Sequence, residues 1–188
     1  MTRSPRPRGA VAAALRARRS HSVVGATAPT TRELLPLIAS AGSIADHASL
    51  HPWRIIAVRG TARDRVGAAI AEASGLTGAA AQKLAAKPLR APLLLAVVVS
   101  PKPNIKVPEW EQEAVASGVA HTLSLLLDEA GWGVMWRTGL QVRSDAVARA
   151  HDLAPGERLM GWLYVGAKPD VKSGRREPIN PREHLSSL

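Results

Sequence analysis

An unbroken apolar run limits the folds open to this chain more than any other part of its sequence. Residues 93–100 read LLLAVVVS and lie between Pro92 and Pro101. Polar and apolar residues do not alternate along the run, so neither face of a strand built from it could lie in water. We therefore predict a central β-strand over 93–100, with helices packed on both faces of its sheet.

Helical and extended patterns alternate along the rest of the 188-residue chain. Apolar residues at helical spacing predict further helices, and short apolar runs that end at a glycine or a loop predict further strands. The helices are expected at 10–19, 29–42, 62–74, 79–87, 109–131 and 145–152, and the strands at 54–60, 133–139 and 159–168. This order predicts an α+β fold, an α/β sandwich in which helices flank a central mixed sheet.

Composition along the chain indicates a single domain at 10–168. Residues 1–9 are rich in proline and arginine, which predicts a disordered, basic N-terminus. Residues 169–188 are polar, carry three prolines and show no periodicity. We expect this last segment to be an extended C-terminal arm.

Charge and cysteine content exclude several classes of protein. The absence of cysteine excludes disulfides, thiolate metal sites and cysteine nucleophiles. The formal net charge is +10, but the first 32 residues hold seven arginines and no acidic residue, which leaves +3 on the rest. The fold therefore carries no basic stripe, and nucleic acid is not the expected partner.

The longest apolar run is too short to cross a bilayer, so we expect a cytoplasmic protein with no membrane partner.

Three short polar clusters hold the candidate functional residues. The first, Arg18-Arg19-Ser20, lies at the end of the helix predicted at 10–19. Two guanidinium groups and a hydroxyl are good donors to a phosphate, because arginine makes forked, charge-assisted hydrogen bonds. The alternative, which these residues alone favour, is a solvated basic helix end that stabilises the negative pole of the helix dipole.

The second cluster, ADHASLHPW at 45–53, places two histidines just before a strand. His47 and His51 have the spacing of a helical metal pair, but Pro52 disfavours a helix there and no HExxH glutamate is present. We therefore expect no metal site, and the lack of a GxSxG motif argues against a serine-based triad. A rigid turn with a structural His47 and a core Trp53 is the alternative to a functional site.

The third cluster, Trp136-Arg137-Thr138-Gly139, ends a predicted strand. An indole, a guanidinium and a hydroxyl in succession are typical of an anion-binding loop with a stacking surface, and Gly139 permits close backbone approach. A core tryptophan beside an exposed arginine is the alternative.

Taken in order, the clusters resemble the nitroreductase family of FMN-dependent oxidoreductases. The chain runs RRS, then DHxSxHPW entering a strand, then a long helix closing on GxxWRTG, then GWLYVG. It is most similar to the short, compact branch of that family, whose pattern runs RRS, PDHGSxQPW, WRSG and GFLYLG. The resemblance covers about residues 10–170.

The resemblance implies a homodimer with an FMN site at its interface and a C-terminal arm that embraces the partner subunit. It assigns cofactor-binding roles in three groups. The phosphate and ribityl chain would be held by Arg18, Arg19 and Ser20, with contacts completed by Trp136, Arg137 and Thr138. His47 would lie beside the flavin, reaching it from the partner subunit, and Pro52 and Trp53 would close the site beneath the ring. No side chain is implied as a catalytic nucleophile.

The implied activity is an NAD(P)H oxidoreductase. NADH or NADPH would deliver hydride to FMN and leave, and a nitroaromatic, quinone or similar electron-poor acceptor would then bind in the same pocket. The chain departs from the branch's pattern at Ser43, Ala45 and His51, where arginine, proline and glutamine are common. A non-catalytic flavin or small-ligand binding protein of the same fold is therefore the main alternative. A flavin enzyme with another reaction, such as reductive dehalogenation, is a second.

Overall fold

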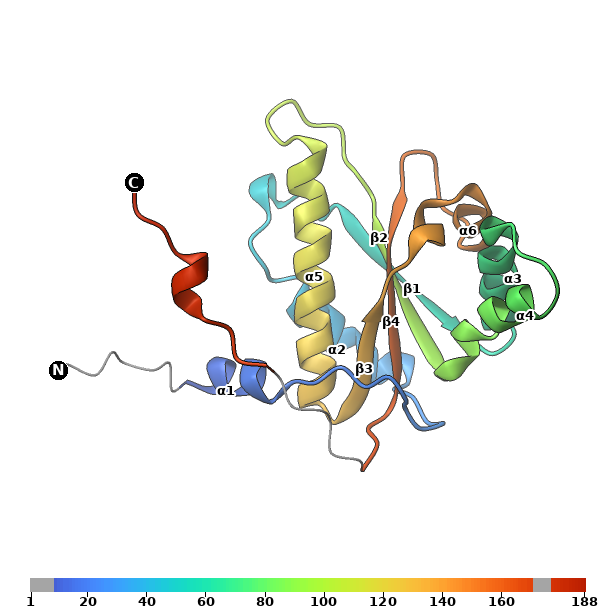
Figure 1. Cartoon of the computed structure of the whole chain (residues 1–188). Helices are drawn as coiled ribbons and strands as arrows, with labels where there is room; N and C mark the ends of the chain where they lie inside the picture. Colours follow the sequence, from blue (N-terminus) through green and yellow to red (C-terminus); the bar gives the residue numbers. More distant parts are fainter. Residues whose placement is uncertain (1–8, 171–176) are drawn as a thin grey trace.

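Four β-strands form the centre of the structure, a computed structural model that describes residues 9–170 and 177–188 (Figure 1). They are β1 (Trp53–Arg59), β2 (Leu93–Val99), β3 (Trp132–Arg137) and β4 (Arg158–Ala167), in the order β1-β2-β4-β3. With helices on both sides of this sheet, the predicted α+β fold is confirmed.

The sheet is antiparallel between every pair of neighbours, whereas the sequence predicted a mixed sheet. One long helix connects β2 to β3, and the two strands do run in the same direction, as such a crossover requires. However, β4 lies between them and runs opposite to both. Local patterns predict the crossover, but they do not reveal which later strand is inserted into it.

Each predicted helix is present, with ends that differ by a few residues. The α-helices are α1 (Ala10–Ala17), α2 (Thr31–Ala41), α3 (Ala62–Ser74), α4 (Gly78–Ala85), α5 (Glu109–Glu129) and α6 (Asp145–Ala150). Short 3-10 turns, which the sequence patterns did not predict, form η1 (His47–Ser49), η2 (Lys87–Arg90), η3 (Leu140–Arg143) and η4 (Pro181–His184). The predicted N-terminal segment lies mostly outside the described residues, as does part of the predicted arm, residues 171–176. The described end of that arm, 177–188, is exposed throughout.

Two apolar layers lie on opposite faces of the sheet, and every residue of β2 is buried between them. Side chains of β2 alternate between the layers: Leu94, Ala96 and Val98 face α3 and α6, while Leu93, Leu95 and Val97 face α2 and α5. Figure 1 shows α2 and α5 on one side of the strands and α3, α4 and α6 on the other. The predicted two-sided burial of this strand is therefore confirmed.

A buried polar pair lies in the layer that contains α6. The indole Nε1 of Trp162 donates to Nε2 of His151 at 2.9 Å, and His151 Nδ1 lies 2.8 Å from the carbonyl oxygen of Val147. The carbonyl can only accept, so Nδ1 carries the proton and Nε2 keeps its lone pair. His151 is thereby held as the neutral imidazole, and burial lowers its pKa below the ordinary value of 6.5.

This pair predicts that stability falls in mild acid. Below pH 6.5 the unfolded chain binds a proton at His151 that the folded chain does not, so the free energy of unfolding decreases as pH falls. The expected contribution is up to about 1 kcal/mol per pH unit. Urea unfolding at a series of pH values should give a smaller slope for His151→Gln than for the unmodified chain, and equal slopes would contradict the assignment.

Candidate functional site

The first and third polar clusters lie side by side, although more than a hundred residues separate them. After α1 the chain runs along the outer edge of β3, where His21 N donates to Val134 O at 3.0 Å. Arg137 Nη2 in turn donates to the carbonyl oxygen of Ser22 at 3.3 Å. The fold therefore brings Arg18–Ser20 next to Trp136–Thr138, which we call the arginine cluster.

Within the arginine cluster, Arg18 and Arg19 have different surroundings. Arg18 Nη1 lies 3.4 Å from the hydroxyl of Ser20, so these two side chains form one group of donors. Arg19 Nη1 turns back and donates to the carbonyls of Arg16, Ala17 and Arg18 at 2.5–3.0 Å. Those carbonyls lie at the end of α1, so Arg19 stabilises that end of the helix, as the alternative interpretation of the sequence predicted.

A buried carboxylate at the end of α5 lies beside the segment that follows Ser20. His21 is buried, and its Nε2 lies 3.6 Å from Oδ1 of the buried Asp128. Lys168 Nζ donates to the same carboxylate oxygen at 3.1 Å. Sequence patterns missed this group because its three members come from distant segments and form no motif.

Trp136, Arg137 and Thr138 line a pocket of about 310 Å³ whose other residues include Trp162 and Tyr164. The Arg137 guanidinium carbon lies 5.2 Å from the centre of the Tyr164 ring, within cation–π range. Burial raises the pKa of Tyr164 to about 12, so its hydroxyl stays protonated at neutral pH. The pocket thus joins a cation and a hydroxyl to an aromatic surface.

Two donors of the arginine cluster are buried without a hydrogen-bond partner among the described residues: Nε of Arg137 and Nε1 of Trp136. An unpaired buried donor costs about 1–3 kcal/mol, so such groups are rare unless a ligand or water satisfies them. The Trp136 ring also packs edge-on against His121 at 4.8 Å between ring centres. These donors make the cluster a candidate binding site for a ligand rich in acceptors.

The backbone of this site depends on Gly161, at a β-bulge in β4. Gly161 has a φ of +130°, and a Cβ there would lie 2.5 Å from Arg137 O and 2.8 Å from Trp136 Nε1. Only glycine lets β4 approach the end of β3 this closely. The sequence motif GWLYVG contains this residue, but its spacing alone did not show what the glycine contacts.

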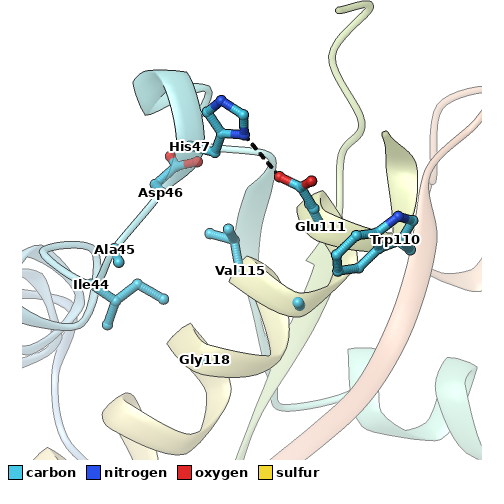
Figure 2. A pocket seen from close by; sticks show the side chains of 9 residues that line it. Ile44, Ala45, Asp46, His47, Trp110, Glu111, Val115 and Gly118 are labelled. Carbon is cyan, nitrogen blue, oxygen red and sulfur yellow. Dashed lines mark hydrogen bonds and ion pairs between the residues drawn. The ribbon is translucent and has the colours of Figure 1, made fainter. Parts of the chain in front are cut away.

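The second polar cluster lies elsewhere, at the start of α5. His47 Nδ1 lies 2.8 Å from Glu111 Oε2, and both residues line a pocket of about 680 Å³ together with Trp110 (Figure 2). Pro52 is buried, and its carbonyl accepts from Ser100 N at 2.8 Å. Trp53 packs in the layer of α2 and α5, as the structural alternative predicted.

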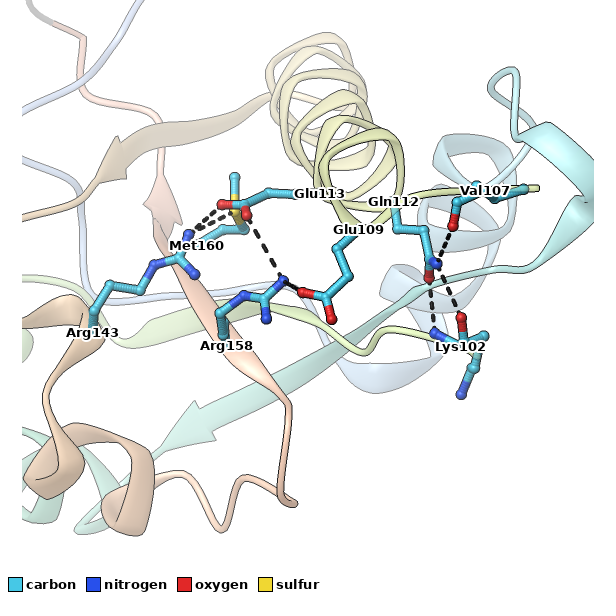
Figure 3. A network of polar contacts seen from close by, with 8 residues as sticks. All are labelled: Lys102, Val107, Glu109, Gln112, Glu113, Arg143, Arg158 and Met160. Carbon is cyan, nitrogen blue, oxygen red and sulfur yellow. Dashed lines mark hydrogen bonds and ion pairs between the residues drawn. The ribbon is translucent and has the colours of Figure 1, made fainter. Parts of the chain in front are cut away.

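Residues Glu109 to Glu113, at the start of α5, contact four different parts of the molecule. Glu109 and Glu113 pair with Arg158 of β4 and Arg143 of η3 (Figure 3). The buried Gln112 amide bonds to the backbone of Lys102 and Val107, which holds the proline-rich loop. Trp110 and Glu111 face the pocket. This end of α5 is therefore fixed from several sides.

The two polar regions contact α5 at different points along its length. Glu111 contacts His47 near the first turn, and Asp128 contacts His21 near the last. Seventeen residues separate the two acids, which at a rise of 1.5 Å per residue is about 25 Å. Trp136 of the arginine cluster contacts α5 at His121, ten residues beyond Glu111, which is about 15 Å along the helix.

The chain is similar to known proteins over most of its length. Residues 15–167 match the sequence profile described as "Nitroreductase family", which is most of the chain. The chain belongs to the nitroreductase family. The resemblance inferred from the sequence motifs is thereby confirmed.

Individual nitroreductase-family relatives agree with this assignment. The Escherichia coli (strain K12) protein named "Putative NAD(P)H nitroreductase YdjA" is 32% identical over 159 residues, covering 83% of this chain and 86% of the relative. The solved structure of a nitroreductase-like family protein from Bacillus cereus has a TM-score of 0.82 at 20% identity, covering 98% and 99% of the two chains. The FMN and NADPH-dependent nitroreductase NfnB from Sphigopyxis sp. strain HMH has a TM-score of 0.74 at 18% identity, covering 95% and 99%. At these identities the two structures support the nitroreductase fold.

The residues of the arginine cluster suit the flavin mononucleotide that this family implies. A phosphate monoester needs cationic and hydroxyl donors, which Arg18, Ser20, Arg137 and Thr138 supply. The phosphate and ribityl chain also offer acceptors to the guanidinium of Arg137, whose Nε has no hydrogen-bond partner among the described residues. Among residues 9–170 and 177–188 there is no group of three His, Asp or Glu side chains suited to a metal, and no helix long and apolar enough to cross a membrane.

The close approach at Gly161 predicts a large effect of a single methyl group. Gly161→Ala should lower the free energy of unfolding by about 2–4 kcal/mol, because the Cβ collides with backbone and the φ is unfavourable. Gly156→Ala is the matched control: its φ is +83°, but a Cβ there meets nothing within 4 Å. It should cost only about 1 kcal/mol. Equal losses for both variants in urea unfolding would contradict the contact.

Proposed function

We propose that this nitroreductase-family protein is an FMN-dependent NAD(P)H oxidoreductase that reduces nitroaromatics, quinones or similar electron-poor acceptors in the cytoplasm. The observation that carries the proposal is the arginine cluster, where two distant segments converge around two unpaired buried donors. The names of the relatives support the choice of reactants, since NfnB is FMN and NADPH-dependent and YdjA is named for NAD(P)H.

The chain's own groups bind and orient in this proposal, and none acts as a nucleophile. When bound, FMN supplies the hydride chemistry, accepting from NAD(P)H and passing electrons to the acceptor in a second, separate half-reaction. Arg18, Ser20 and Arg137 hold the phosphate and ribityl chain through charge-assisted hydrogen bonds. Tyr164 stays neutral beneath Arg137, so its ring packs against the guanidinium without a phenolate that would compete with an anionic ligand.

We further propose that the working unit is a homodimer with shared sites. Within one chain, His47 contacts α5 at Glu111 and Trp136 contacts it at His121, and the family resemblance implies that a second copy supplies His47 to the flavin held by the arginine cluster. Large apolar side chains near the cluster support an interface there, since Val11, Val23 and Leu140 are 70%, 71% and 96% exposed. In this proposal the arm at 169–188 lies against the partner subunit.

The first experiment asks whether the protein binds flavin and accepts hydride. FMN should bind with quenching of its fluorescence, and NADH or NADPH should bleach the flavin absorbance until an electron-poor acceptor restores it. Arg137→Ala should raise the FMN dissociation constant about 10- to 100-fold. The exposed Arg149→Ala, which loses the same charge elsewhere, should leave the constant unchanged.

Two outcomes of this experiment would redirect the proposal. Flavin binding without bleaching by either nicotinamide would favour the non-catalytic binding protein, for which the departures at Ser43 and His51 are the sequence evidence. No binding of FMN at any concentration would refute both.

The second experiment tests the shared site. Arg137→Ala and His47→Ala homodimers should each have low acceptor reductase activity. Unfolding them together and refolding should restore about a quarter of the sites, because half the dimers are mixed and each holds one intact site. If both residues served the same site from one chain, mixed dimers would hold no intact site, and activity would not rise above the average of the two variants.

A further inference from the structure

We propose that Glu111 is a positioning residue: it orients the His47 imidazole so that Nε2 is the nitrogen presented to the cofactor. The inference rests on the proposed function for the identity of that cofactor. Its structural basis is the 2.8 Å contact between Glu111 Oε2 and His47 Nδ1, made across 64 positions of sequence.

The contact fixes the hydrogen on one particular ring nitrogen. A carboxylate only accepts hydrogen bonds, so His47 Nδ1 carries a proton whether the ring is neutral or charged. Figure 2 shows the other ring nitrogen pointing away from Glu111. His47 Nε2 has no hydrogen-bond partner among the described residues, and the side chain is 54% exposed. Nε2 is thus the atom left for a ligand.

Glu111 is free for this role because of the residue that caps α5. Glu111 is the third residue of its helix, where a glutamate commonly accepts from the backbone N–H of the N-cap residue. Glu33 does this in α2, where its carboxylate accepts from Thr30 N at 2.7 Å. The N-cap of α5 is Pro108, which has no N–H to donate. The Glu111 carboxylate therefore reaches outward to His47 while still lying at the positive end of the helix dipole.

The two partners differ in how firmly they are held. Glu111 stands on the rigid start of α5, next to the buried Gln112. His47 lies in a strained turn, where three residues that are not glycine have left-handed φ values: 62° at Ala48, 51° at Ser49 and 47° at His51. Such a turn persists only where its surroundings hold it, and strain of this kind gathers at functional sites.

Other charged and titratable groups near His47 do not replace Glu111. Asp46 Oδ2 is used within the turn, where it accepts from His51 N at 2.7 Å. Glu109 and Glu113, on the same helix end, pair with Arg158 and Arg143. Among the described residues Glu111 is therefore the carboxylate that contacts the His47 ring.

The first test reads the ring itself in the full-length protein without added FMN. Long-range ¹H–¹⁵N correlation spectra in alkaline buffer, where imidazoles are neutral, report which nitrogen is protonated, and His47→Ala assigns the signal. His47 should be the Nδ1–H tautomer in the unmodified chain and revert to the Nε2–H form in Glu111→Ala. Glu109→Ala, which removes the same charge from the same helical turn, should keep the Nδ1–H form. An Nε2–H tautomer in the unmodified chain would overturn the proposal.

The second test measures FMN affinity in a double-mutant cycle. Glu111→Ala should raise the FMN dissociation constant about 10-fold, and Glu109→Ala less than about 2-fold. In a His47→Ala background, Glu111→Ala should add less than about 2-fold, because Glu111 acts through the ring. An equal loss with and without His47 would mean that Glu111 only stabilises the turn, and would overturn the proposal. If the unmodified chain binds no FMN, the proposed function fails, whereas the tautomer measurement still decides whether Glu111 orients His47.

Discussion

Burial of β2 on both faces is the constraint on which the rest of this structure depends. Each fully buried leucine or valine contributes about 1.5–3 kcal/mol relative to an exposed one, so exposing either face of LLLAVVV would cost many kcal/mol. Helices must therefore cover both sides of the sheet. On one side that cover is α2 and α5, and on the other it is α3 and α6.

Helix α5 contacts both parts of the candidate site. Trp136 of the arginine cluster packs against His121, and Asp128 accepts from Lys168 near the end of the helix. Glu111 holds His47 near the start of the helix. In the proposed homodimer, a second chain would bring its His47 to the arginine cluster of the first.

Small backbone features explain how this fold accommodates a binding site. Glycine at 161 allows two strands to approach until a carbonyl and an indole N–H occupy the space of a side chain. Proline at 108 removes the donor that would otherwise hold Glu111 against its own helix. Gly161 has no Cβ and Pro108 has no backbone N–H. The missing Cβ leaves room for Trp136 and Arg137, and the missing N–H leaves the Glu111 carboxylate available to His47.

Local patterns in the sequence were enough to predict the α-helices and strands. The spacing of apolar residues indicates which face of an element is buried, and capping residues indicate where a helix begins and ends. These patterns also indicated the three polar clusters and, by their order and spacing, the family. They did not predict that β4 enters between β2 and β3, that Arg19 turns back to the end of α1, or that His47 contacts Glu111. The strand order and the His47 contact depend on packing between segments that are distant in the sequence. The contact between His47 and Glu111 spans 64 positions, so no periodic pattern in the sequence indicates it. It forms only because the tertiary structure places the start of α5 beside the turn that precedes β1.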